Sequence, residues 1–90
     1  MQEVKDMTVS EIDLEVYARQ RRPQIGQQVR IIRKQFNWTQ EQVALYLGCS
    51  RRRVNRVEQG ITDFTVFELE LLAQKFQVPL ADLLGYSQQL

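Results

Sequence analysis

Ninety residues are enough for one domain with its own hydrophobic core and too few for two. The share of apolar residues, 43%, suits a folded globule rather than a disordered chain. With no histidine and one cysteine, Cys49, the chain offers no internal disulfide, no ordinary zinc site and no catalytic histidine. A glycine-rich phosphate loop is also missing, so the sequence predicts a protein that is not an enzyme and uses no metal or cofactor.

The sequence carries no sign of a membrane segment or of export. No apolar run approaches the ~18 residues of a membrane span. The first residues, MQEVKDMTVSE, lack both the basic and the apolar region of a signal peptide. We therefore expect a cytoplasmic protein without membrane contact.

The formal net charge of +1 conceals an uneven distribution of charge along the chain. Residues 19–60 carry ten Lys and Arg against two acidic residues, whereas residues 1–18 and 61–90 are both acidic. A basic middle between acidic ends concentrates a positive field. The polyanion that such a field most naturally attracts is nucleic acid.

The first 22 residues show the least regular pattern. A capping-box pattern and an apolar stripe favour a helix over about 9–21. Residues 12–16 also alternate like a half-buried strand, so both interpretations stay open for this segment. Pro23 is expected to separate the segment from the next helix, over about 24–36.

Four further helices follow, and most of their ends carry recognisable signals. Thr or Ser precedes three of them, Gln or Glu completes two capping boxes, and glycine follows two of the ends. We expect these helices at about 40–47, 51–58, 66–76 and from Pro79 to 84. With no convincing strand among them, the sequence predicts an all-α fold.

Four arginines fall within six positions of the predicted helix 51–58. On a helical wheel at about 100° per residue, Val54 and Val57 mark the packing side. The outer arc carries Arg51, Arg52, Asn55 and Arg56, with Arg53 at its border. Arginine forms paired bonds to guanine, asparagine does so to adenine, and flanking guanidinium groups hold phosphates, so the arc suits a major groove. A merely solvated basic face is the alternative, and it is disfavoured because only Glu58 lies near enough along the helix to relieve the repulsion.

The segment from Gln40 to Gly60, QEQVALYLGCSRRRVNRVEQG, strongly resembles the helix-turn-helix of the Cro and lambda-repressor (XRE-like) family. The matching residues are Thr39-Gln40, Ala44, Gly48, Ser50, Val54 and Glu58-Gln59-Gly60. Gln59, where asparagine is usual, and Cys49 at the turn depart from the pattern without threatening the fold. The likeness extends over about residues 25–84.

The resemblance implies a five-helix, lambda-repressor-like DNA-binding domain over residues 23–86. It leaves an N-terminal extension, 1–22, and a short tail, 87–90. In the extension, three arginines precede Pro23 and form a possible DNA arm, along phosphates or in a minor groove, or else a solvated basic run. These are Arg19, Arg21 and Arg22.

The resemblance also implies roles for single residues. The residues expected to contact DNA are Gln40, Ser50, Arg51, Arg52, Arg53, Asn55, Arg56 and Gln59. Three arginines of the outer arc match positions that reach base edges, whereas Arg53 and Gln59 match positions near the phosphate backbone. Gln40 is expected to bridge a phosphate and the recognition helix. Arg33 and Glu58 match a partly buried ion pair that belongs to the scaffold.

The function that these observations favour is a sequence-specific regulator of transcription, a repressor that binds double-stranded DNA as a homodimer. Residues 9–22, or the last helix with Tyr86 and Leu90, are the candidate dimer surfaces. The alternative is an antitoxin-like interaction module, which binds a protein partner through residues 1–22 and regulates its own operon through the helix-turn-helix.

Overall fold

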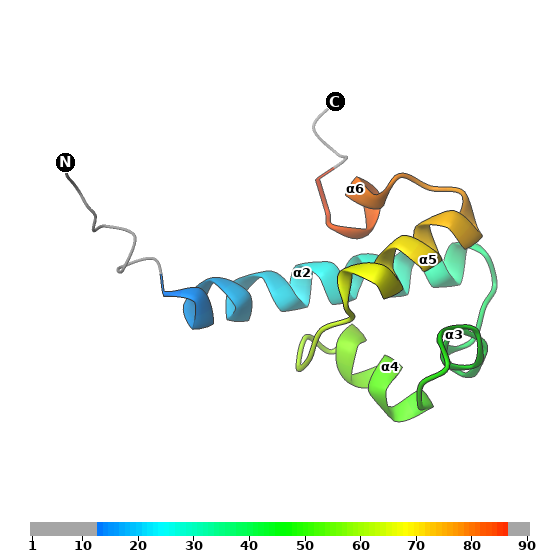
Figure 1. The fold of residues 1–90 in the computed structure, drawn as a ribbon, viewed down its shortest axis with the longest axis horizontal. Coiled ribbons are helices and arrows are strands. Elements are labelled where there is room, and N and C mark those ends of the chain that lie inside the picture. The colour runs from blue at the N-terminus through cyan, green and yellow to red at the C-terminus, as the bar shows by residue number, and fades with distance from the viewer. Residues whose placement is uncertain (1–12, 87–90) are drawn as a thin grey trace.

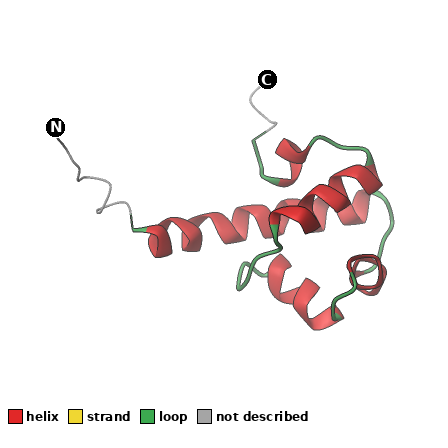
Figure 2. Cartoon of the chain, in the orientation of Figure 1, coloured by secondary structure: helices red, strands yellow, loops and turns green. Residues whose placement is uncertain are grey.

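The computed structural model describes residues 13–86, and within this range the chain consists of helices joined by short turns and loops (Figure 1, Figure 2). The helices are α2 (Leu14–Gln35), α3 (Gln40–Leu47), α4 (Arg51–Glu58), α5 (Val66–Phe76) and α6 (Leu80–Leu83). No strand occurs in residues 13–86, and the all-α, five-helix prediction is confirmed. None of the helices in this part of the chain is long and apolar enough to cross a membrane.

Helix α2 forms the long axis of the molecule, and the other helices gather around its C-terminal half (Figure 1). α4 packs against α2, and α3 packs in turn against α4. α6 contacts α2 and α5 on the other side of α2. The N-terminal turns of α2 project beyond the globule (Figure 1).

The expected break at Pro23 is wrong, because α2 runs through this residue as one helix of 22 residues. A proline inside a helix costs about 3 kcal/mol. Contacts of the two preceding residues with distant segments offset this cost: Arg22 pairs with Asp63 at 3.2 Å, and Arg21 donates to the backbone oxygen of Leu84 at 2.6 Å.

The boundary predicted between residues 22 and 23 therefore lies inside a helix. Of the predicted helix 9–21, residues 14–21 are helical, which decides against a strand there, and residues 9–12 lie outside the described range. Asp13 begins the helix as its N-cap and accepts a hydrogen bond from the backbone N–H of Glu15 at 3.0 Å.

The helices α3, α4 and α5 begin and end where their local signals predict. Thr39 and Thr65 each form a complete capping box, and Ser50 caps α4 by accepting from the backbone N–H of Arg53. Gly48 ends α3 with a φ of 74°, a left-handed conformation that glycine adopts without steric cost. α3 and α4, joined by the turn at Gly48, are the two helices of the predicted helix-turn-helix.

A single core lies where the five helices meet. Its buried apolar residues are Val29, Ile32, Val43, Ala44, Val54, Val57, Phe64, Leu69, Leu72, Ala73, Phe76 and Leu83. Every helix contributes at least one of them. Burying a Val, Leu, Ile or Phe side chain stabilises the fold by about 1.5–3 kcal/mol, which sustains helices too short to persist alone.

Gly26 sets how closely α2 approaches the end of α4. A Cβ atom at this position would lie 2.2 Å from the backbone oxygen of Val57 and 3.0 Å from that of Glu58. Backbone atoms cannot move aside as the end of a flexible side chain does. Any residue larger than glycine therefore has to push α4 away from α2.

We predict that Gly26→Ala lowers the free energy of unfolding by about 1–3 kcal/mol or more, as overpacking does. A decrease would indicate the close approach of α4, because Gly→Ala inside a helix otherwise raises the free energy of unfolding by about 1 kcal/mol. Gln27→Ala, at the exposed neighbouring position, is the matched control and should be close to neutral. Urea unfolding of the three proteins measures the difference. A Gly26→Ala protein as stable as the wild type would contradict the close approach.

Candidate nucleic-acid interface

Helix α4 is anchored on one side and open on the other. Val54 and Val57 are 0% and 2% exposed and fix its inner side in the core. The outer arc consists of Arg51 and Arg52, which are exposed, and of Asn55 and Arg56, which are half-buried; Arg53, at the border of the arc, is also half-buried. The core therefore holds α4 so that its basic side faces away from the other helices.

Ser50 and Gln59 stand at the two ends of this helix. Ser50 is the N-cap, and its Oγ accepts the backbone N–H of Arg53 at 3.0 Å. Gln59 is the C-cap; its backbone N–H bonds to the backbone oxygen of Asn55 at 3.0 Å, and the residue is exposed. The hydroxyl of Ser50 thus serves the helix itself, while the side chain of Gln59 is accessible to a partner.

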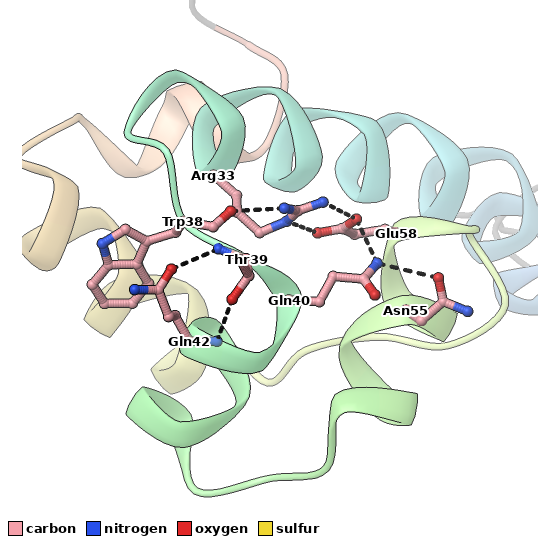
Figure 3. A network of polar contacts seen from close by, with 7 residues as sticks. All are labelled: Arg33, Trp38, Thr39, Gln40, Gln42, Asn55 and Glu58. Carbon is pink, nitrogen blue, oxygen red and sulfur yellow. Dashed lines mark hydrogen bonds and ion pairs between the residues drawn. The ribbon is translucent and has the colours of Figure 1, made fainter.

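The residues that the resemblance pairs in the scaffold, Arg33 and Glu58, form a two-bond ion pair between α2 and α4 (Figure 3). Nε of Arg33 donates to Oε2 at 2.6 Å, and Nη2 donates to Oε1 at 3.0 Å. The side chains are only 9% and 4% exposed. Nη1 of Arg33 also donates to the backbone oxygen of Trp38 at 2.8 Å, so the pair also holds the turn before α3.

Gln40, the first residue of α3, connects this ion pair to the outer arc (Figure 3). Its Nε2 donates to Oε1 of Glu58 at 3.0 Å and to Oδ1 of Asn55 at 3.1 Å. The predicted contact of Gln40 with the recognition helix is therefore present. Its predicted contact with a phosphate stays a prediction.

Arg53 has a different environment from the other arginines of α4. Its terminal nitrogens donate to both carboxylate oxygens of Glu68 at 2.6 and 2.8 Å and to the backbone oxygen of Asp63 at 3.0 Å. Its guanidinium also lies over the ring of Phe64, 5.3 Å from the centroid. These bonds raise the pKa of Arg53 and lower that of Glu68, mainly through the hydrogen bonds between them.

The predicted contact of Arg53 with a phosphate stays a prediction, and the structure adds a second role for this residue. Its terminal nitrogens hold α4 against α5, so it also belongs to the scaffold. Glu68 lies 15 positions away on another helix, so the pattern of residues along α4 did not indicate this partner.

The three arginines of the possible DNA arm lie on the N-terminal half of α2, in regular helix. Arg19 lies 3.8 Å from Glu15 one turn earlier, and both side chains are exposed. Arg22 pairs with Asp63. Arg21 bonds to Gln24 and to the backbone of α6, with its guanidinium 4.8 Å from the ring centroid of Tyr86. Arg21 and Arg22 thus fasten α2 to the globule, whereas for Arg19 the only ion pair within the described residues is the one with Glu15 on the same helix.

An open groove beside α4 brings two further basic residues, Arg30 and Lys34, next to Arg33 and Arg51. It is lined by Arg30, Arg33, Lys34, Asn37, Trp38, Thr39, Gln40, Glu41 and Arg51. Arg30 and Lys34 are four positions apart and therefore share one side of α2. That spacing, within the basic middle of the chain, was the signal available in the sequence. The N-terminus of α3 also opens on the groove, and helix N-termini favour anions.

We predict that Glu58→Ala lowers the melting temperature clearly, whereas Arg52→Ala changes it little. Removing one member of a buried ion pair leaves an uncompensated charge, at a cost of about 3–5 kcal/mol. Arg52 is exposed on the outer arc. Thermal unfolding followed by circular dichroism compares the two variants. Equal melting temperatures would contradict the structural role of the ion pair.

The ion pair of Glu68 predicts a dependence of stability on pH. Because folding lowers the pKa of Glu68 from its ordinary value of 4.5, the pair stabilises the fold above that pH. This contribution is lost as the pH falls from 4.5 through the lower pKa of the folded state. Glu68→Gln should be about 1–3 kcal/mol less stable than the wild type near neutral pH.

The difference between wild type and Glu68→Gln should shrink steadily in acid, as urea unfolding over a pH series measures. Glu70→Gln, at an exposed position of the same helix, is the control and should track the wild type more closely. A Glu68→Gln deficit that stays constant from neutral to acid pH would show that charge is not the source of the stabilisation.

Comparison with known proteins agrees with this geometry. A family model described as Helix-turn-helix matches residues 29–83. The chain is 30% identical over 66 residues to Antitoxin PezA of Streptococcus pneumoniae, and 32% identical over 59 residues to the competence pilus inhibition repressor of Acinetobacter baylyi. These alignments cover 73% and 66% of the chain, and 42% and 54% of the relatives, so the chain spans about half the length of either.

Among solved structures, the fold is similar to that of the restriction-modification controller protein C.AhdI of Aeromonas hydrophila, with a TM-score of 0.65 and 25% sequence identity. The superposition covers 72% of this chain and 94% of the controller protein. The match over residues 29–83 includes α3, α4 and the ion pair that joins α4 to α2. The chain therefore belongs to the helix-turn-helix family of DNA-binding regulators, of the XRE type that the Cro and lambda repressors represent.

Proposed function

We propose that this protein is a transcriptional repressor that binds double-stranded DNA as a homodimer, with α4 as its recognition helix. The observation that carries the proposal is the placement of α4: its valines are buried, its scaffold contacts are satisfied within the fold, and its basic arc is presented outward. A helix of this size fits the major groove. A regulator of this kind works where the DNA is, which agrees with the cytoplasmic location expected from the sequence.

The basic residues divide into two groups by their surroundings. Arg51, Arg52 and Arg56 lie on the outer arc and are suited to base edges, where arginine forms two bonds to guanine. Arg30 and Lys34 line the groove beside the N-terminus of α3 and are suited to the phosphate backbone. Gln59, at the C-terminal end of α4, is suited to a phosphate through its exposed side chain. The side-chain amide of Gln40 is bonded to Glu58 and Asn55, so a phosphate in the groove would meet this residue through its backbone N–H at the N-terminus of α3.

We predict that the alanine variants of these residues affect DNA binding in two different ways, one specific to a base and one common to all sequences. Replacing the arginine that reads a guanine, one of Arg51, Arg52 and Arg56, should cost about 1–3 kcal/mol at a single base position and relax the preference there. Lys34→Ala should weaken binding to all sequences alike and reduce the salt dependence by about one contact. Arg53→Ala should mainly lower stability.

The assay is binding of each variant to the duplex selected from a random pool and to its single-base variants, over a range of salt. If every arginine substitution weakens binding uniformly across sequences, the arc only holds the backbone and direct readout is wrong.

A homodimer is proposed because one recognition helix contacts too few base pairs for useful specificity. The surface that fits best is the outer side of α5, where Phe67 and Leu71 are four positions apart and 72% and 43% exposed. Ile61, 49% exposed, follows the C-terminal end of α4. A two-fold axis near this surface places the two copies of α4 close to each other, as paired half-sites require.

We predict that Phe67→Glu shifts the protein from dimer to monomer in sedimentation, because it introduces repelling charges at the contact between copies. The matched variant is the exposed pair Leu14→Glu with Tyr17→Glu on the projecting part of α2, which should leave the dimer intact. The opposite pattern would place the dimer surface on α2.

A second candidate function has one observation in its favour. Leu14, Val16 and Tyr17 are 78%, 42% and 49% exposed on the turns of α2 that project beyond the globule (Figure 1). One relative is by name an antitoxin. If the substitutions on α2 leave both the dimer and DNA binding unchanged, this part of α2 is left for a partner protein, as the antitoxin-like alternative requires.

A further inference from the structure

The hydrogen bonds around Glu58 impose a direction on the amide groups next to it. An ionised carboxylate only accepts hydrogen bonds. Arg33 donates to both of its oxygens, and this charged pair keeps Glu58 an acceptor. Any further group that bonds to Glu58 must therefore donate. Gln40 meets this requirement by turning its amino group, Nε2, toward Oε1 at 3.0 Å.

The orientation of Gln40 in turn determines that of Asn55. The amino group of Gln40 has two hydrogens; one is directed to Glu58, and the other meets Asn55 at 3.1 Å. Because the incoming group is a donor, Asn55 has to offer its carbonyl oxygen, Oδ1. Its amino group, Nδ2, consequently points away from Gln40 (Figure 3). The carboxylate of Glu58 thus fixes, through Gln40, the orientation of the Asn55 amide on the outer arc.

We propose that this relay makes Asn55 a hydrogen-bond donor in the DNA complex, so that it reads a guanine instead of the adenine that asparagine commonly reads. The proposal rests on the function proposed above. Adenine recognition uses the amide oxygen for N6 and the amide nitrogen for N7, whereas guanine presents two neighbouring acceptors, N7 and O6. In this protein the oxygen is turned back toward α3, and the nitrogen is the end that faces outward.

Gln40 is a positioning residue in this scheme. Gln40→Met keeps a side chain of similar length but cannot donate, so it releases Asn55. It also removes one hydrogen bond from Oε1 of Glu58, which keeps both of its bonds from Arg33. The amide of Asn55 can then turn and use both of its ends on adenine. A residue that only stabilised the fold would not change which base is preferred.

The first test uses the free protein. In nuclear magnetic resonance spectra, the Nδ2 protons of Asn55 should exchange with solvent faster than the Nε2 protons of Gln40, because only the latter are both directed to acceptors within the fold. Slower exchange at Asn55 than at Gln40 would overturn the assigned orientation.

The second test measures the base preference. The wild type, Asn55→Ala, Asn55→Asp and Gln40→Met are titrated with the selected duplex and with a duplex series that exchanges each G·C pair for A·T. At one G·C pair, the wild-type preference over A·T should fall about three- to tenfold in both Asn55 variants, the loss expected for one hydrogen bond. Using ratios between duplexes removes any uniform effect of the new Asp charge.

In Gln40→Met, the preference at the same pair should move toward A·T. A wild type that prefers adenine at the position sensitive to Asn55, or Asn55 variants that weaken all duplexes alike, would overturn the inference and leave the proposed repressor function standing. A wild type that selects no preferred duplex would overturn both.

Discussion

The position of α4 depends on the ion pair between Arg33 and Glu58. Two charges that are 9% and 4% exposed have lost most of their hydration, and such a pair is tolerated only when further hydrogen bonds satisfy it. Trp38 and Gln40 provide those bonds, one on each side. The bonds have fixed directions and come from α2, α3 and the turn between them. They determine how α4 is rotated about its own axis, which contact between apolar side chains alone leaves less sharply defined.

A second constraint fixes the distance between α2 and α4 at the end that carries the ion pair. At Gly26 the backbone of α2 lies against the last carbonyl groups of α4. At Gly60, just after α4, a Cβ atom would lie 2.9 Å from the Cα of Pro23, so the two backbones meet again three residues earlier on α2. Pro23 thus lies against Gly60, where no side chain fits between the two backbones. The same contact helps to explain how α2 continues through a residue that ordinarily ends a helix.

The parts of this fold that could be predicted from the sequence are those set by neighbouring residues. Caps at Thr39, Ser50 and Thr65 act within one helical turn, and the helices that follow them begin where expected. Val54 and Val57 are spaced for one helix face, and the core holds that face. In the candidate site, this placed the outer arc of α4 correctly.

The features that were missed depend on residues far apart in the sequence. The continuity of α2 rests on contacts from its arginines to residues 63 and 84. The role of Arg53 depends on Glu68, and a helical wheel of α4 contains no information about α5. The groove draws on α2, α3 and α4 together, so no single helix reveals it. In each case the local pattern was compatible with several tertiary arrangements.

These distant contacts also answer why so many arginines can share so short a helix. Within residues 13–86, Glu15 pairs with the exposed Arg19 on the same helix, whereas Glu58, Asp63 and Glu68 each neutralise an arginine that holds the scaffold. The arginines of the outer arc form no ion pair with a carboxylate of these residues. Their mutual repulsion is moderated by water and salt in the free protein, and phosphates of a bound duplex would reduce it further. Separating paired from unpaired arginines lets the fold stand without DNA and keeps the positive field on the side of α4 that faces away from the core.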